Sequence, residues 1–285
     1  MSVTPGSPPL SDLEWLALDP TDEAERLTLT VTPGISTSGG FIYGGAGLGL
    51  GVAALEHATG RPVVWATAQY LRFAGPGSKG EIVVDEPARG HFVSQARCSL
   101  VCDGEEILTV IGAVGGRDYP VEGRWLTAPD VPGPEHAEPL PRWWAVDDSA
   151  ASRFDLLDAT GHLPGDVRET GRAVYWGRVP ELGDRFSTLK LAILGDTHMS
   201  AFHSALGQVV GSNSLDNTLR VMERVDTEWL LIDHRLEDIG RGFASATGYF
   251  WSPDGRLMGS IAQTLRIKNL PPDHPAHPDH QPPSQ

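Results

Sequence analysis

Runs of hydrophobic, β-prone residues separated by turn residues occupy most of the chain, and two longer apolar stretches suit helices instead. In the stretch over 45–58, Leu48, Val52 and Leu55 recur at i, i+4 and i+7, which places them on one face of a helix. A second helix is predicted over 186–206. The β-prone runs predict ten strands, over 25–33, 62–74, 80–88, 91–102, 105–115, 171–179, 214–224, 228–237, 242–252 and 256–268.

The same order of elements occurs twice, at an offset of 151 residues. GHFVSQARCSLVCDGEEILTVIGAV, from Gly90, aligns with RGFASATGYFWSPDGRLMGSIAQTL, from Arg241. In both copies a β-prone run enters an Asp-Gly turn and continues into another apolar run, which is the strongest short-range signal for a β-hairpin. Each half therefore reads as strand, helix and four strands, with an antiparallel sheet that curls around its helix. The predicted fold class is α+β, one architecture built twice.

The repeats divide the chain into five parts. The first repeat covers 25–118 and the second covers 169–269, with an N-terminal segment over 1–24 and a Pro-rich linker over 119–168. Both ends are expected to be loosely folded. The tail over 270–285 is predicted to be disordered, because it is rich in Pro and His and has nothing apolar to bury.

The many glycines of the first helix need a structural reason. A glycine inside a helix costs about 1 kcal/mol relative to alanine. Close approach of the helix to the concave face of the sheet would offset this cost, because side chains would hold the two apart.

Charge and cysteine content limit the class of protein. The 22 Lys and Arg residues against 37 Asp and Glu residues leave a net charge of -15, which disfavours nucleic acid and anionic membranes as partners. Cys98 and Cys102 lie about 13 Å apart along one predicted strand, too far for a disulfide, which fits a reducing compartment. The N-terminus lacks the features of a signal peptide, and the apolar stretch over 41–55 is too short to span a bilayer. A cytoplasmic location is therefore expected.

Motifs for cofactors and metals give weak signals. The segment 49–54 matches G-x-G-x-x-A, but no Asp or Glu occurs over 61–80 to hold a ribose, so helix packing is the favoured explanation. His198 and His203 are five residues apart and fall on different faces of a helix. Neither a cofactor nor a metal is expected. Three further histidines are expected to be solvated in the tail: His274, His277 and His280.

Three polar residues distinguish the second repeat from the first. Asp196 lies on or beside the second helix, Ser214 opens a β-run, and Gln263 lies inside the last strand. The equivalent positions of the first repeat are Gly45, Val63 and Gly112. A polar side chain inside a strand is costly if it is buried without a partner. In the structural interpretation Gln263 faces solvent, Asp196 stabilises a helix end and Ser214 ends a strand. The residues alone leave this interpretation and a catalytic one open.

Several segments, taken in order, resemble the double-hotdog acyl-CoA thioesterases of the thioesterase II type. They are IYGGA, QYLRFAG, SLDNTLRV and DGRLMGSIAQTLRI, together with the paired hairpins. The resemblance runs from about Glu25 to Asn269, apart from the linker. It implies two hotdogs, each a long helix wrapped by an antiparallel sheet, and hydrolysis of acyl-CoA to a free acid and CoA. By position, the family's water-orienting Asp, Thr or Ser, and Gln correspond to Asp196, Ser214 and Gln263.

The chain departs from the family pattern at a few positions. Ser214 stands where Thr is usual, D-N-T over 216–218 replaces D-H-S, and Gln263 precedes Thr-Leu rather than Glu-Gly. The hydroxyl, amide and carboxylate types are retained. The resemblance implies acyl-CoA as substrate and a place in fatty acid metabolism, while sheet edges left open in each half favour a homo-oligomer.

Two alternative functions belong to other classes. One is a non-catalytic acyl-CoA-binding or lipid-binding protein that keeps the acyl channel. The other is a hotdog enoyl-CoA hydratase, for which an Asp/His pair is typical. His198 is only two residues from Asp196 on the predicted helix, so we expect its side chain to point elsewhere.

Overall fold

The computed structural model describes residues 8–140, 145–163, 166–206 and 211–268. The predictions for the tail over 270–285 and its three histidines fall outside the described residues. Within them, the strands are β1 (Leu18–Pro20), β2 (Arg26–Thr30), β3 (Val63–Tyr70), β4 (Lys79–Ala88), β5 (Val93–Cys102), β6 (Glu105–Gly115), β7 (Glu138–Pro139), β8 (Asp155–Asp158), β9 (Arg172–Arg178), β10 (Gly211–Ser214), β11 (Asp216–Val221), β12 (Leu230–Gly240), β13 (Phe243–Trp251) and β14 (Leu257–Lys268).

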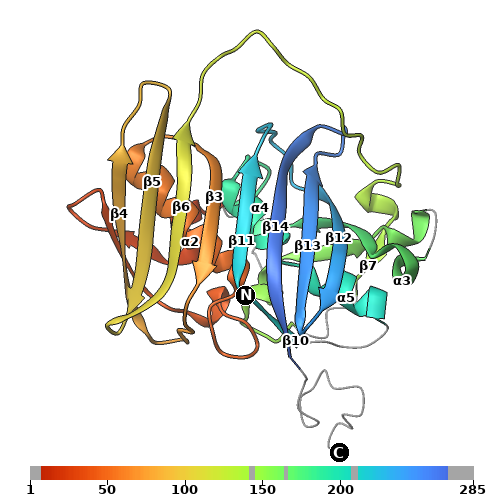
Figure 1. Cartoon of the computed structure of the whole chain (residues 1–285), viewed down its shortest axis with the longest axis horizontal. Coiled ribbons are helices and arrows are strands. Elements are labelled where there is room, and N and C mark those ends of the chain that lie inside the picture. The colour runs from red at the N-terminus through yellow and green to blue at the C-terminus, as the bar shows by residue number, and fades with distance from the viewer. Residues whose placement is uncertain (1–7, 141–144, 164–165, 207–210, 269–285) are drawn as a thin grey trace, which may run out of the picture.

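The fourteen described strands form one curled antiparallel sheet. Its order is β1-β2-β4-β5-β6-β3-β11-β14-β13-β12-β9-β8-β7, and β10 also pairs with β14 (Figure 1). At its centre β3 pairs with β11, where Thr67 faces Thr218 and the two hydroxyl oxygens lie 3.0 Å apart. These two threonines are 151 residues apart in sequence. The predicted hairpins are confirmed, since β5 pairs with β6 and β13 pairs with β14.

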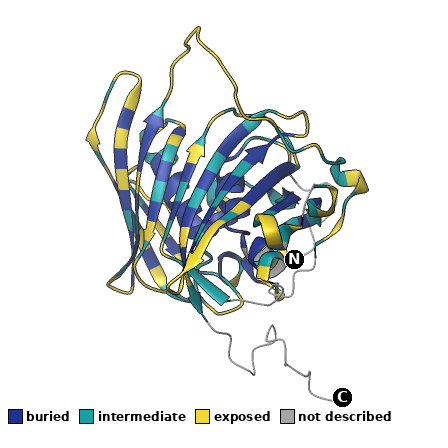
Figure 2. Cartoon of the chain, turned by 45° about the vertical axis from the view of Figure 1, so that its right-hand side comes forward, coloured by how far each residue is buried: buried dark blue, intermediate teal, exposed yellow. Residues whose placement is uncertain are grey.

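The described helices are α1 (Asp12–Leu16), α2 (Gly44–Thr59), α3 (Val167–Thr170), α4 (Thr188–Gly195) and α5 (Met199–Leu206), with short 3-10 turns between elements. In the view of Figure 1, α2 and α4 lie behind the sheet, and α3 and α5 lie toward its right-hand side. The strands carry stripes of buried and exposed residues in Figure 2, because successive side chains of a strand point to opposite faces. The buried side of the sheet packs on the helices, and α2 is buried at every position from Gly45 to Leu55.

The glycines of α2 allow close packing on two sides. A Cβ at Gly51 would lie 2.3 Å from Cγ2 of Val110 on β6, so the predicted close approach of helix and sheet is confirmed. A Cβ at Gly45 would lie 2.6 Å from the carbonyl oxygen of Ala192 on α4. The sequence did not predict this second contact, in which one helix touches the backbone of the other.

Three predictions of local structure are wrong. The single helix over 186–206 is two helices, with a break at 196–198 between α4 and α5. The β-run over 214–224 divides at Leu215 into β10 and β11. The N-terminal end is not loose over its described residues, since α1 places Trp15 and Leu16 in the core at 1% and 0% exposure. These two apolar side chains supply the burial that orders the segment.

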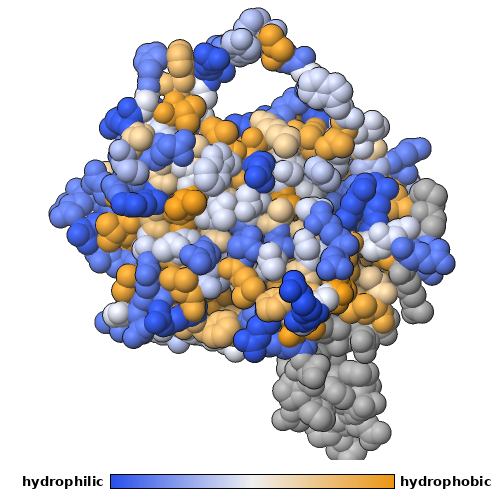
Figure 3. All heavy atoms as spheres, viewed as in Figure 1, coloured by the Kyte–Doolittle hydropathy of each residue, from blue (hydrophilic) through white to orange (hydrophobic). Residues whose placement is uncertain are grey.

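The predicted linker over 119–168 contributes two strands to the sheet beside the second repeat. Its strand β8 pairs with β9, and β7 pairs with β8. The indole nitrogen of Trp176 donates a hydrogen bond of 2.9 Å to the carbonyl oxygen of Pro132, which fixes the Pro-rich stretch against β9. Figure 3 shows that hydrophobic residues on the outer face of the sheet are scattered among hydrophilic ones. In the described ranges, no helix has the length and hydrophobicity to cross a bilayer.

Candidate active site

The three polar residues singled out from the sequence meet in the structure. Asp196 caps the C-terminus of α4, Ser214 ends β10, and Gln263 lies within β14. The Gln263 Nε2 donates to Asp196 Oδ1 at 2.6 Å and also to the Ser214 hydroxyl oxygen. The Ser214 hydroxyl in turn donates to Asp196 Oδ1 at 3.3 Å. The interpretation that Gln263 faces solvent is wrong, because its amide contacts Asp196 and Ser214 and the residue is only 5% exposed.

The first half of the chain contributes the N-terminus of α2 to this site. The backbone N–H of Gly45 donates to Asp196 Oδ2 at 2.8 Å. Partial positive charge at a helix N-terminus stabilises an anion placed there. A Cβ at Gly44 would lie 2.6 Å from the same oxygen, so glycine leaves room beside the carboxylate. From the sequence, Gly45 was identified only as the repeat counterpart of Asp196, although two adjacent glycines at the start of a helix indicate close approach of another group.

Burial and hydrogen bonding act in opposite directions on the Asp196 carboxyl. Desolvation is the larger effect and raises its pKa from 3.8 to about 6, while the donors Gln263, Gly45 and Ser214 favour the charged form. The carboxyl is therefore mostly ionised at neutral pH and accepts a proton readily. A pKa close to the working pH is what general-base catalysis requires.

His198 lies beside Asp196, contrary to the expectation that it points elsewhere. Its Nδ1 is 3.8 Å from Asp196 Oδ1, and both side chains are 5% exposed. The reason is the break between α4 and α5, because residues 196–198 do not follow helical geometry. Burial, followed by the nearby His234, lowers the pKa of His198 to about 3, so the ring is neutral at neutral pH. His198 Nδ1 is buried, and no described residue forms a hydrogen bond with it.

A buried hydrogen-bond network holds the break between the two helices. The Thr197 hydroxyl donates to the carbonyl oxygen of Leu194 at 2.5 Å, and its oxygen lies 2.8 Å from the Tyr175 hydroxyl. Tyr175 also contacts Nδ1 of His234. Thr197 is the residue between Asp196 and His198, so this network fixes the backbone that carries both.

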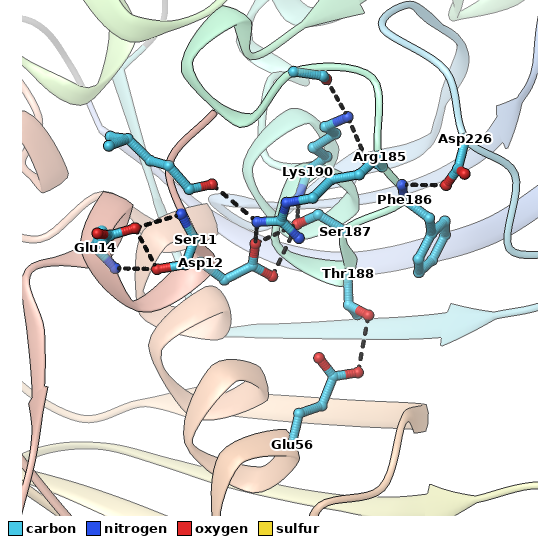
Figure 4. Close-up of polar contacts among 12 residues, drawn as sticks. Ser11, Asp12, Glu14, Glu56, Arg185, Phe186, Ser187, Thr188, Lys190 and Asp226 are labelled. Carbon is cyan, nitrogen blue, oxygen red and sulfur yellow. Dashed lines mark hydrogen bonds and ion pairs between the residues drawn. The ribbon is translucent and has the colours of Figure 1, made fainter. Parts of the chain in front are cut away.

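The start of α4 is anchored separately, as Figure 4 shows. Ser187 caps the helix and also donates to the Asp12 carboxylate, which pairs with Arg185 at 2.6 Å. Lys190, only 2% exposed, has its ammonium group bound by backbone oxygens. Those oxygens belong to Gly183, Arg185 and Thr227. The helix that ends at Asp196 is thus held at both ends.

The site opens on a cavity of about 460 Å³. Asp196, His198 and Ser214 are among the residues that line it. Apolar and aromatic side chains form much of the remaining wall: Phe41, Ile42, Tyr43, Tyr70, Phe73, Ile107 and Leu108. Among the described lining residues the cations are Arg72 and Lys268, and the Lys268 ammonium lies 5.4 Å from the centre of the Phe73 ring. The cavity thus combines an apolar wall, a buried carboxylate and positive charge.

The curled antiparallel sheet with its enclosed helices is a hotdog fold, and solved structures agree. A conserved protein of unknown function with this fold from Alicyclobacillus acidocaldarius is 18% identical, with a TM-score of 0.76 over 91% of this chain and 98% of that chain. An acyl-CoA thioesterase II from Mycobacterium marinum is also 18% identical, with a TM-score of 0.69 over 91% of this chain and 99% of that chain. At this identity, both comparisons establish the fold alone.

Two family models match the chain in sequence. The model for the acyl-CoA thioesterase N-terminal domain matches residues 31–115, and the model for the C-terminal domain matches residues 128–267. A protein from Novosphingobium aromaticivorans, assigned as a thioesterase, is 30% identical, with a TM-score of 0.80 over 89% of this chain and 99% of that chain. Among curated proteins, no sequence matches. The chain belongs to the acyl-CoA thioesterase family, which confirms the family and the class of thioester hydrolase predicted from the sequence.

Proposed function

We propose that this chain hydrolyses acyl-CoA to a free acid and CoA through a water that Asp196 activates directly. The observation that carries the proposal is the buried Asp196 carboxylate at the wall of an apolar cavity, with a pKa raised to about 6. Such a group accepts a proton from a water that attacks the thioester carbonyl carbon. General-base catalysis of this kind contributes roughly 10²–10⁴-fold to the rate.

Ser214 and Gln263 act on the carboxylate in this proposal. Both donate to Asp196 Oδ1, while the Gly45 N–H donates to Oδ2. The carboxylate is thereby fixed in orientation, and it retains an acceptor position for the water. The hypothesis that Gln263 holds the water stays a prediction from the sequence, and the contacts of its Nε2 with Asp196 and Ser214 support a role in orienting the carboxylate.

We also propose that the fold is a double hotdog, in which the linker joins two repeats over 25–118 and 169–269. The supporting observation is that residues 151 positions apart meet at the centre of the molecule. Gly45 donates to Asp196, and the Thr67 hydroxyl contacts that of Thr218. Contacts between equivalent residues are expected along a local two-fold axis relating two copies of one unit.

The substrate assignment draws on the cavity wall. Its apolar and aromatic residues suit an acyl chain. Lys268, together with Arg72, which pairs with Glu105 at 2.9 Å, supplies the local positive charge that a phosphate-bearing CoA needs in a protein of net charge -15. A cytoplasmic location, a homo-oligomer and a role in fatty acid metabolism stay predictions from the sequence.

The hydratase alternative is favoured by one observation, the 3.8 Å approach of His198 to Asp196. A thiol-release assay over a panel of acyl-CoA and enoyl-CoA substrates separates the candidates. A thioesterase liberates free CoA thiol, a hydratase consumes the enoyl double bond without releasing thiol, and a binding protein does neither.

The matched variants for this assay are Asp196→Asn and, as a control, Asp22→Asn at an exposed carboxylate. We expect thiol release by the parent and the control, and a loss of about 10²-fold or more in kcat for Asp196→Asn. Near-parental kcat in Asp196→Asn would show that Asp196 does not activate the water.

A further inference from the structure

The hydrogen bonds within the site raise the question of what orients the reacting water. From the described residues, Asp196 accepts three hydrogen bonds: Ser214 and Gln263 donate to Oδ1, and Gly45 donates to Oδ2. An ionised carboxylate offers about four acceptor positions, two on each oxygen, so these donors leave one on Oδ2 for a hydrogen of the water. A water bound by one hydrogen alone rotates freely about that contact. A second acceptor facing the cavity would direct the oxygen lone pair at the carbonyl carbon.

Of the described residues that line the cavity, three carry a buried side-chain atom with no hydrogen-bond partner in the described part of the chain: Thr37, His198 and Asn213. Of these, His198 has its ring nitrogen 3.8 Å from the Asp196 carboxylate. A buried polar atom without a partner costs free energy, and such an atom beside a reactive group indicates a partner that arrives with the reaction.

We propose that His198 is a further catalytic residue of this chain, whose Nδ1 accepts a hydrogen bond from the water that Asp196 deprotonates. The inference rests on the proposed function and adds a named second acceptor to it. The separation of 3.8 Å between Nδ1 and Asp196 Oδ1 is too long for a direct hydrogen bond. In the proposal the water occupies the open acceptor position of Oδ2 on the same carboxylate and donates its other hydrogen to Nδ1.

The protonation state of His198 suits an acceptor. Its ring is neutral at neutral pH, because burial lowers its pKa to about 3. A neutral imidazole has one N–H and one bare nitrogen, so an accepting Nδ1 requires the proton to be on Nε2. His198 therefore orients the water and transfers no proton.

The step balances without any further reactant. The water oxygen forms a bond to the thioester carbonyl carbon as one O–H bond breaks, and that proton moves to the Asp196 carboxylate. The tetrahedral intermediate then expels the CoA sulfur as the C–S bond breaks. The thiolate takes the proton held by Asp196, which regenerates the carboxylate and releases the free acid and the thiol.

The surrounding structure supports a positioned His198. Its repeat counterpart 151 positions earlier is Gly47, so the second half alone carries an imidazole here. The Thr197 network described above fixes the backbone on its N-terminal side, and the ring packs edge-on against Phe202 at 5.9 Å between ring centres.

The experiment compares His198→Leu, which removes the acceptor, with His198→Asn, whose side-chain oxygen lies near the position of Nδ1. His57→Leu, at an exposed position of α2, is the control. We expect kcat of His198→Leu to fall by about 10- to 100-fold with KM nearly unchanged, and His198→Asn to recover most of it. Parental kcat in His198→Leu, a loss confined to KM, or equal losses in both variants would overturn the proposal.

A measurement on the parent protein keeps the inference testable if either variant fails to fold. Nitrogen-15 NMR of labelled histidine, at neutral pH, reports which ring nitrogen carries the proton. The proposal requires an unprotonated Nδ1 at His198, and a proton on Nδ1 would refute it. Thiol release by the parent together with a negative result at His198 would leave the proposed function intact, whereas no thiol release by the parent would count against the function itself.

Discussion

Asp196→Asn is expected to separate activity from stability, because the charge that serves catalysis costs free energy in the fold. Raising the carboxyl pKa from 3.8 to about 6 by burial corresponds to about 3 kcal/mol of lost folding stability at pH 7. Asparagine has the same volume and carries no charge, so the substitution removes this cost.

Hydrogen bonding offsets part of that gain. The Asp196 oxygens face donors on both sides, the Gly45 N–H and the Gln263 Nε2. The asparagine amide group must face one of them with its own N–H, which leaves a donor unpaired at a cost of about 1–3 kcal/mol. At pH 7 the variant is therefore expected to be at least as stable as the parent, while kcat falls by about 10²-fold or more.

The folding stability of the parent is expected to depend on pH through Asp196. Between pH 3.8 and 6 the folded parent holds a proton on Asp196 that the unfolded chain has released, so parental stability falls as the pH rises through this window. The cost of the charge is about 1 kcal/mol at pH 4.5 and about 3 kcal/mol at pH 7. The asparagine variant lacks this slope.

Urea unfolding of both proteins from pH 4.5 to pH 7.5 measures the difference directly. The free energy of unfolding of the variant minus that of the parent should increase by about 2 kcal/mol between pH 4.5 and pH 7. The parental kcat should rise with pH around 6 as the base ionises. A stability difference independent of pH would refute the reasoning that Asp196 is buried as a charge.

The remaining predictions concern the trio and the packing around it. Ser214→Ala and Gln263→Ala should each lower kcat less than Asp196→Asn does. The loss of kcat in the double variant should be smaller than the product of the two single losses, because both residues act on one carboxylate. Additive free-energy losses in a double-mutant cycle would contradict this. Gly44→Ala should lower kcat by about 10²-fold in a thiol-release assay, because its Cβ would lie 2.6 Å from Oδ2 of Asp196. The control Gly116→Ala, whose Cβ would have no atom within 4 Å, should match the parent. Lys190→Met should lower the free energy of unfolding by about 2 kcal/mol at pH 10, because it leaves backbone carbonyls unpaired. At pH 7 removal of the buried charge opposes this loss. Burial lowers the pKa of Lys190 to about 8, so between pH 8 and 10 the unfolded parent holds more protons than the folded parent. The free energy of unfolding of the parent minus that of the variant should therefore increase from pH 8 to pH 10, which urea unfolding at the two pH values would measure.

The sequence determined most of the fold through local patterns. Strand runs, Asp-Gly turns and the spacing of apolar residues predicted the hairpins and the long helix α2 that the structure contains. These features depend on residues that are close in sequence, because their spacing indicates which face of a helix or strand is buried. The offset of 151 residues identified Asp196, Ser214 and Gln263 as polar replacements of apolar or glycine positions, and the structure brings the three together.

Only the tertiary structure decided how the site is completed. The helix expected over 186–206 has apolar residues on both sides of its break, so its pattern does not mark Asp196 as the point where α4 ends. The break depends on long-range contacts, among them the hydrogen bond between Thr197 and Tyr175, and it turns His198 toward the carboxylate. The N-terminus of α2 reaches Asp196 from 151 residues away, because packing of the two halves brings them together. Contacts of this kind are set by the geometry of packed elements, which local sequence periodicity does not encode.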